Sequence, residues 1–195
     1  MRVKYILFDM GGVLFTNGTK DIAEFISIAY RIPVESVEAR MKTFAPGLRL
    51  GKINLKSYWS LTFPDIKIDA DKISGKWLGS YRIQTGLMEA AKRLSSTHAI
   101  GIQSTNFKER FEYPDAKYGL TNLFKHIFLS YNIGEMKPSK GFYEEIINSL
   151  GCPAGEILIV DDKEVNVESA LSLGMQGFLL RNPEGIKELE ADIRA

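Results

Sequence analysis

The chain has 195 residues, of which 45% are apolar, enough for one domain with a sizeable core or one domain with a small insertion. Its 25 basic and 24 acidic residues leave a net charge of +1, and no basic block or acidic tail favours a nucleic-acid or membrane partner. The single cysteine, Cys152, allows no internal disulfide and no cysteine metal cluster. No stretch reaches the roughly 18 apolar residues of a membrane span, so we expect a cytoplasmic protein that acts on a small molecule.

Short apolar runs, each bounded by polar residues or glycine, predict five β-strands. They lie at about 3–8, 98–103, 126–129, 156–160 and 176–180. Between the later runs, residues 140–150 and 164–173 each place apolar side chains on one helical face and are followed by a glycine. This alternation predicts an α/β fold, with a Rossmann-like parallel sheet core and helices on both of its faces.

Residues 16–84 break the alternation, because they contain no convincing strand. Apolar residues at helical spacing predict about four amphipathic helices there, with breaks at Pro33, Ala45-Pro46-Gly47 and Phe63-Pro64-Asp65. A crossover between strands needs only one helix, so this segment is predicted to be an inserted helical bundle. We therefore predict a core domain of residues 1–15 and 85–195, with a helical cap domain of residues 16–84 over the end of the first strand.

Polar groups follow several of the predicted strands. Asp9 ends the first apolar run, and burying an unpaired carboxylate costs several kcal/mol, so packing alone does not explain it. Ser104-Thr105-Asn106, Lys137-Pro138 and Asp161-Asp162 follow later apolar runs in the same way. Any one of these groups alone is equally well explained as a helix cap, a turn or a surface charge. Together they favour one crevice at the carboxyl ends of the strands, where open α/β sheets bind ligands.

The types of residue at these strand ends fit phosphoryl transfer. A strand-end aspartate can attack phosphorus if a cation offsets the repulsion between the two anions. The adjacent carboxylates Asp161 and Asp162 are suited to a hard metal such as Mg²⁺. Lys137 supplies a fixed positive charge, while Thr105 and Asn106 supply neutral hydrogen-bond donors. The sequence therefore predicts an enzyme that acts on a phosphorylated small molecule.

The order of these motifs resembles the haloacid dehalogenase superfamily of hydrolases and phosphotransferases, over essentially the whole chain. The four matching segments are Phe8-Asp9-Met10-Gly11-Gly12-Val13-Leu14, Thr105-Asn106, Lys137-Pro138 and Ile159-Val160-Asp161-Asp162-Lys163-Glu164-Val165-Asn166. The helical insertion after the first motif is similar to a cap of that family, and the most similar branch contains sugar-phosphate phosphatases. The resemblance implies a Mg²⁺-dependent phosphatase of a small phosphorylated metabolite, such as a sugar phosphate, that works through an aspartyl-phosphate intermediate.

The resemblance also implies a metal site. Asp9 would be both the catalytic nucleophile and a Mg²⁺ ligand, and the backbone carbonyl of Gly11 would be a second ligand. Asp162 would be the main acidic ligand of the fourth motif, with Asp161 beside it.

A phosphate site is implied next to the metal. Thr105 and Asn106 would bind the transferring phosphoryl group, with Ser104 as an alternative for the hydroxyl role. Lys137 would hold both the phosphate and the nucleophile, which makes it the second catalytic residue.

One position departs from the family pattern. Most phosphatases of the superfamily carry a second aspartate two residues after the nucleophile, which acts as general acid and base, and this chain has Gly11 there. Loss of such a group costs about 100-fold to 10,000-fold in rate. We expect a slow phosphatase, a preference for good leaving groups, or a substitute acid from the cap or from Glu135. The alternatives are a non-catalytic binding or regulatory protein of the same fold, and a 2-haloacid dehalogenase, although dehalogenases lack the paired acids.

Overall fold

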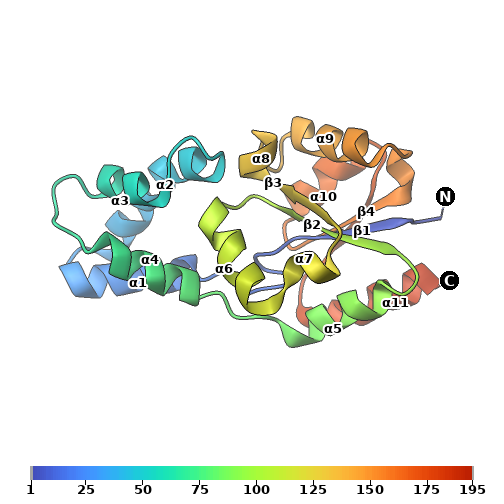
Figure 1. Cartoon of the computed structure of the whole chain (residues 1–195), viewed down its shortest axis with the longest axis horizontal. Coiled ribbons are helices and arrows are strands. Elements are labelled where there is room, and N and C mark those ends of the chain that lie inside the picture. The colour runs from blue at the N-terminus through green and yellow to red at the C-terminus, as the bar shows by residue number, and fades with distance from the viewer. Residues whose placement is uncertain (1, 195) are drawn as a thin grey trace.

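The computed structural model describes residues 2–194, which contain a five-stranded parallel sheet with helices on both faces (Figure 1). The strands are β1 (Tyr5–Phe8), β2 (Ala99–Ser104), β3 (His126–Leu129), β4 (Ile157–Asp161) and β5 (Gln176–Leu179). Their order is β3-β2-β1-β4-β5, and every neighbouring pair is parallel. Each strand lies on a predicted apolar run, so the predicted α/β fold is confirmed.

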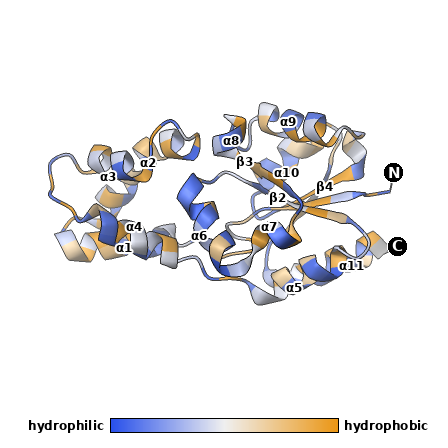
Figure 2. Ribbon diagram, in the orientation of Figure 1, coloured by the Kyte–Doolittle hydropathy of each residue, from blue (hydrophilic) through white to orange (hydrophobic). Residues whose placement is uncertain are grey.

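Two layers of helices cover the sheet. The helices that pack on it are α5 (Thr85–Leu94) and α11 (Ile186–Arg194) on one face, and α9 (Lys140–Leu150) and α10 (Glu164–Leu171) on the other (Figure 1). Alternate residues of β1 serve the two layers, because Ile6 and Phe8 belong to one apolar cluster and Leu7 to the other. The strands are strongly apolar in Figure 2, as expected of a sheet buried on both faces.

The remaining helices and turns connect these elements. They are α6 (Lys108–Tyr118), α7 (Leu120–Leu123), α8 (Ser130–Ile133) and the two 3-10 turns η1 (Ala154–Glu156) and η2 (Pro183–Gly185). Helix α6 follows β2 and lies between the sheet and the helices of residues 16–84 (Figure 1).

Residues 16–84 contain four helices around an apolar cluster to which Phe107, outside this segment, also contributes. The helices are α1 (Thr19–Tyr30), α2 (Val34–Arg49), α3 (Leu55–Thr62) and α4 (Ala70–Gly79), and they lie together at one end of the molecule (Figure 1). Trp59 is fully buried among them, with its ring centroid 5.3 Å from that of Trp77. The predicted break at residues 45–47 is wrong. Helix α2 continues through Pro46, whose carbonyl accepts the Leu50 N–H at 3.0 Å, as far as Arg49.

The ends of this segment lie side by side. Phe15 and Ile83 form an antiparallel bridge, and the Thr16 N–H donates to the carbonyl of Arg82 at 2.9 Å. The separate apolar cluster and the paired ends support the proposed division into a cap domain of residues 16–84 and a core domain of the remaining chain. None of the helices in the part of the chain that the structure describes is long and apolar enough to cross a membrane.

Candidate active site

The register of the sheet brings Asp9 next to Asp161. Phe8 of β1 pairs with Val160 of β4. The residues that follow them, Asp9 and Asp161, therefore lie beside each other at the end of the two strands. The Asp9 N–H donates to the carbonyl of Val160 at 2.9 Å, which continues the ladder by one step. The strand order reverses between β1 and β4, because β2 lies on the other side of β1. These two aspartates therefore lie at the switch point where open α/β sheets bind ligands.

Lys137 lies between the two carboxylates. Its Nζ is 2.9 Å from Oδ1 of Asp9 and 2.7 Å from Oδ2 of Asp161, and all three side chains are buried. Burial opposes the charge of Lys137, but the two carboxylates outweigh it and raise the pKa of Lys137 above its usual value. The structure thus brings together the first, third and fourth motifs of the sequence around one buried ammonium.

Asp161 accepts four hydrogen bonds. Its Oδ1 accepts the Lys163 N–H at 3.0 Å and Nδ2 of Asn166 at 2.8 Å, while Oδ2 accepts Nε2 of Gln103 at 3.1 Å besides the Lys137 ammonium. Burial opposes ionisation, but Lys137 and these donors hold the pKa of Asp161 below its usual range. Sequence reasoning missed Gln103 and Asn166. A fully buried glutamine inside an apolar strand was the available signal for the first of them.

Three carboxylates lie close enough to share a cation. Asp9, Asp161 and Asp162 each offer an oxygen within 4.8 Å of the others. Oδ1 of Asp162 is buried and has no hydrogen-bond partner among the described residues. Burial is the main reason that the pKa of Asp9 rises to about 6, and the neighbouring acids add to it against the opposing charge of Lys137. A divalent cation would satisfy the unpaired oxygen and offset this excess of negative charge, so the donor set fits Mg²⁺.

The turn after Asp9 requires glycine at position 12. Gly12 has φ +95°, which L side chains rarely adopt, and a Cβ there would overlap the carboxylate of Asp162. Gln84 holds the turn, because its Nε2 donates to the carbonyls of Gly12 at 3.1 Å and Val13 at 2.8 Å. The glycine therefore lets the first and fourth motifs approach closely.

A cavity of about 290 Å³ lies at these strand ends. Gly11, Thr105, Asn106 and Lys137 line it, as the predicted phosphate site requires. Oγ1 of Thr105 accepts the Lys137 N–H at 3.0 Å, whereas Ser104 is buried within the sheet and does not line the cavity. The geometry supports Thr105 over Ser104 for the hydroxyl role.

Residues of the cavity that the sequence did not reveal come from α6 and from residues 16–84. Arg49, Tyr81 and Arg110 are among them. A Cβ on Gly11 would lie 3.1 Å from the hydroxyl of Tyr81, so a phenol occupies the space beside the position where the family pattern has an acid. These residues follow no local motif, because only the tertiary fold brings them to the strand ends.

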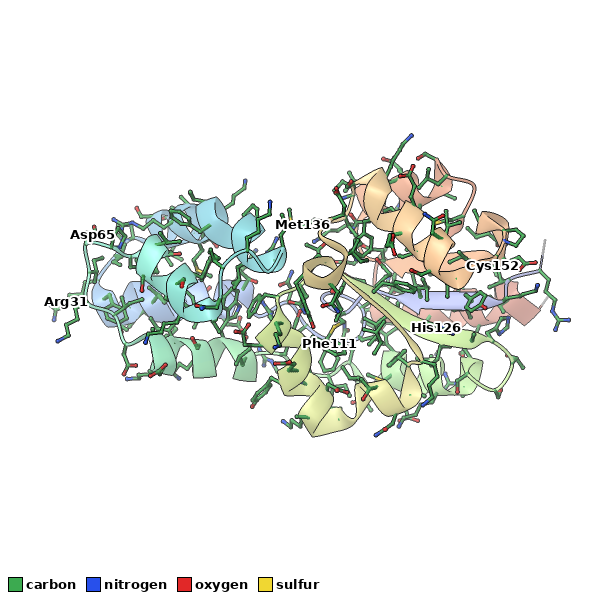
Figure 3. All side chains as sticks on the ribbon, turned by 45° about the horizontal axis from the view of Figure 1, so that its top comes forward. Arg31, Asp65, Phe111, His126, Met136 and Cys152 are labelled. Atoms are coloured by element: carbon green, nitrogen blue, oxygen red, sulfur yellow. The ribbon has the colours of Figure 1, made fainter. Side chains whose placement is uncertain are left out.

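Figure 3 relates the site to the rest of the molecule. Met136, next to Lys137, lies where the helices of residues 16–84 meet the α/β part. His126 and Cys152 lie on the side of the sheet away from those helices. Glu135, predicted as a substitute acid, is exposed and does not line the cavity.

The family model described as haloacid dehalogenase-like hydrolase matches residues 6–179. The chain belongs to this family. Its members share the α/β fold, and an enzyme of the haloacid dehalogenase (HAD) family from Bacteroides thetaiotaomicron, bt-2542, superposes with a TM-score of 0.81 at 18% identity, covering 92% of this chain and 94% of that one. The same enzyme has been solved in complex with magnesium and inorganic phosphate, with a TM-score of 0.76.

Two curated proteins are similar in sequence to this hydrolase. Sesquiterpene phosphatase astK of Aspergillus oryzae is 27% identical over 196 residues, covering 91% of this chain and 89% of the relative. Flavin mononucleotide hydrolase 1 of Arabidopsis thaliana is 25% identical over 113 residues, covering 58% of this chain and 46% of the relative. The chain thus spans less than half the length of the Arabidopsis protein.

Proposed function

We propose that this hydrolase is a Mg²⁺-dependent phosphatase of a small phosphorylated metabolite. The observation that carries the proposal is the buried Asp9–Lys137–Asp161 ion-pair network beside Asp162, whose buried Oδ1 has no hydrogen-bond partner in the described part of the chain. The magnesium and phosphate complex of bt-2542 and the phosphatase name of astK support it. The polar side chains and cations that line the cavity make a sugar phosphate a suitable substrate.

The reaction begins at Asp9. Its carboxylate attacks the phosphorus, a bond forms between a carboxylate oxygen and phosphorus, and the phosphorus–oxygen bond to the leaving alcohol breaks. Lys137 Nζ holds Oδ1 of Asp9 and neutralises charge on the phosphoryl oxygens, to which Thr105 and Asn106 donate hydrogen bonds. Water then attacks the phosphorus of the aspartyl phosphate, which releases inorganic phosphate and restores the carboxylate of Asp9.

Asp9, Asp162 and the carbonyl of Gly11 would hold Mg²⁺ in this proposal. The ion supplies charge that offsets repulsion between the nucleophile and the phosphate. Asp161 has a different role from the groups that would hold the metal, because its four hydrogen bonds already engage both of its carboxylate oxygens. It keeps the ammonium of Lys137 in place beside Asp9.

The departing alkoxide takes its proton from water, because Gly11 has no acidic group that could provide one. The missing acid corresponds to roughly 3 to 5 kcal/mol of barrier. We propose that the enzyme is slow with poor leaving groups and faster with good ones. The same glycine favours the second candidate, a non-catalytic binding or regulatory protein of this fold.

The decisive experiment is a phosphate-release screen with and without Mg²⁺. Sugar phosphates, nucleotides including flavin mononucleotide, prenyl phosphates and phosphorylated acids form the panel, and p-nitrophenyl phosphate provides a good leaving group. We expect Mg²⁺-dependent release that Asp9→Asn abolishes. Asp65→Asn is the matched control, because Asp65 pairs with Arg40 at the far end of the helical segment (Figure 3).

Three outcomes would contradict the proposal. Release that ignores both Mg²⁺ and Asp9→Asn would remove it. Chloride release from a 2-chloro acid without metal would identify a dehalogenase, a function also found on this fold in the L-2-haloacid dehalogenase PA0810, with a TM-score of 0.67 at 16% identity. A folded protein that shows no activity in any of these assays would favour the non-catalytic binding or regulatory function.

A further inference from the structure

We propose that the cavity contains a second anion site, centred on Arg110, which binds a carboxylate or second phosphate group of the substrate. This site is separate from the Asp9 and Lys137 groups that would hold the transferring phosphoryl group. The inference rests on the proposed function in one respect, because it takes the substrate to be a phosphate ester. It adds that the preferred ester is a phosphorylated acid or a bisphosphate.

Arg110 is buried and has no acidic partner within residues 2–194. Only 4% of the residue is exposed, and its Nη1 donates to the hydroxyl of Thr19 at 3.3 Å. Its Nε and Nη2 are buried and have no hydrogen-bond partner among the described residues. A guanidinium carries five N–H donors, and buried donors that lack partners are costly, so Nε and Nη2 still lack an acceptor.

The surroundings of the guanidinium are aromatic and cationic. Its Cζ lies 3.8 Å from the ring centroid of Tyr81 and 5.3 Å from that of Trp77. Burial is the main reason that the pKa of Arg110 is lowered, and the positive charge of Arg49 adds to this against the opposing interaction with Tyr81. Ring faces attract a cation but do not replace hydrogen bonds in the guanidinium plane. An anion would supply both the missing acceptors and the missing charge.

Lys137 and Arg110, two of the cationic residues that line the cavity, face different parts of the molecule. Lys137 contacts Asp9 and Asp161 at the strand ends. Arg110, in contrast, lies against residues of the helical segment and its return to the core, namely Thr19, Trp77 and Tyr81. Both line the same cavity of about 290 Å³. A phosphoryl group bound at Lys137 therefore leaves Arg110 for another group of the same ligand.

The donor arrangement defines the chemistry of that group. Nε and Nη2 lie on one edge of a planar guanidinium, which matches the two oxygens of a carboxylate or phosphate. Arg49 lines the cavity as well and adds a second positive charge. A neutral sugar hydroxyl would not neutralise the charge of Arg110 or Arg49, so a second anionic group is the better partner.

The test compares matched substrates that differ only in the second charge. Phosphorylated carboxylic acids with carbon chains of increasing length are paired with the phosphates of the corresponding neutral amides. We expect at least one acid to exceed its amide in kcat/KM by about 10- to 100-fold, mainly through KM. Arg110→Met should remove this preference, because it should lower kcat/KM for the acids far more than for the amides, while Arg110→Lys should retain part of it.

Arg93→Met is the matched control, because it makes the same change in net charge at an exposed arginine that pairs with Glu190. A wild-type enzyme with no preference for any acid would overturn the inference. So would an Arg110→Met variant that slows acids and amides equally, since this would make Arg110 a structural residue.

A binding measurement separates this inference from the proposed function. Calorimetry with Asp9→Asn protein compares each phosphorylated acid with its amide, and then repeats the titration with Asp9→Asn/Arg110→Met. Tighter binding of an acid that is lost in the double variant supports the second site, even if no substrate is hydrolysed. Equal binding of acids and amides by Asp9→Asn protein contradicts the inference, whatever the phosphatase assay shows.

Discussion

At the scale of single residues, the Tyr81 hydroxyl limits the side chain that position 11 can hold. The Tyr81 hydroxyl lies 3.1 Å from the place where a side chain on Gly11 would begin. An aspartate introduced at position 11 would therefore meet the phenol before it reached a leaving group. The effect of this position on catalysis depends on both residues, which is a reason to change them together.

We predict that Gly11→Asp alone does not accelerate phosphate release and lowers the free energy of unfolding by about 1 to 3 kcal/mol through overpacking. Gly11→Asp/Tyr81→Phe removes the hydroxyl and should release phosphate at least about 10-fold faster than wild type from esters with poor leaving groups. Turnover and denaturant unfolding of both variants, with Tyr81→Phe as control, check this. An equal rate in the double variant and in Tyr81→Phe would show that position 11 has no acid–base role here.

The raised pKa of Asp9 makes the stability of the protein and its binding of Mg²⁺ depend on pH. Its pKa rises from 3.8 in the ordinary carboxyl to about 6, so the folded metal-free protein binds this proton more tightly than the unfolded chain does. The contribution of Asp9 to stability is therefore full below about pH 4 and lost as the pH rises to about 6. A metal ion must bind the ionised form, so Mg²⁺ has the opposite pH preference.

We predict that millimolar Mg²⁺ raises the unfolding temperature at pH 7 to 8 and loses this effect as the pH falls through about 6. Thermal unfolding at a series of pH values, with and without Mg²⁺, measures it. In Asp9→Asn the Mg²⁺ effect should be small at every pH. A wild-type shift that is as large at pH 5 as at pH 7.5 would contradict the role of Asp9 as a ligand.

At the scale of elements, the turn between β1 and the helical segment depends on Gly12. Gly134 provides a comparison, because it also has positive φ, +81°, but a Cβ there would meet nothing within 4 Å. Backbone strain acts at both glycines, whereas overlap with the Asp162 carboxylate occurs only at Gly12.

We predict that Gly12→Ala and Gly134→Ala each lose about 1 to 2 kcal/mol of stability from the left-handed backbone. Gly12→Ala should lose further stability and should also weaken Mg²⁺ binding at least about 10-fold, because Asp162 must move. Urea unfolding and Mg²⁺ titration of the two variants provide the comparison. Equal Mg²⁺ affinity in both would show that the approach of Gly12 to Asp162 does not shape the metal site.

The elements also show what the sequence could and could not predict. Apolar runs between polar residues predicted the five strands. The strand-end rule predicted that Asp9 and Asp161 lie together, because β1 and β4 pair in parallel register. Lys137 joins them from the loop after α8, so strand register does not account for its position. The break at Pro46 was wrong, because hydrogen bonds on either side of a proline can keep a helix continuous. The apolar face predicted within residues 164–173 is only partly buried, because Leu171 of α10 is half exposed. Arg110 resembles any charged residue at the start of a helix, so its burial was not visible in the sequence.

At the scale of the whole molecule, the apolar cluster of α1–α4 is distinct from the two clusters that pack against the sheet. Trp59 is fully buried in the cluster of α1–α4, and Ile159 is fully buried in a cluster beneath the sheet. If residues 16–84 form a separate domain as proposed, damage to one core should leave the other protected.

We predict that Trp59→Ala, which removes about 3 to 5 kcal/mol of packing, increases amide hydrogen exchange in α1–α4 and leaves β1 and β4 protected. Ile159→Ala should increase exchange in the strands first. Exchange measured by mass spectrometry on peptides of the two regions distinguishes them. Equal loss of protection in both regions of the Trp59→Ala protein would show that the chain unfolds as one unit.

The chain enters the helical segment after Phe15 and returns to the core at Ile83, and these two residues pair with each other. This arrangement makes the segment suitable for replacement. Both ends of the intervening segment are fixed next to each other by one bridge and by backbone hydrogen bonds at Thr16 and Leu14. A foreign helical segment with neighbouring ends could therefore be grafted there without altering the strand order, to give a chimera with a new specificity. The graft would have to replace Tyr81 and the partners of Arg110, while the reacting groups on the strands would stay untouched.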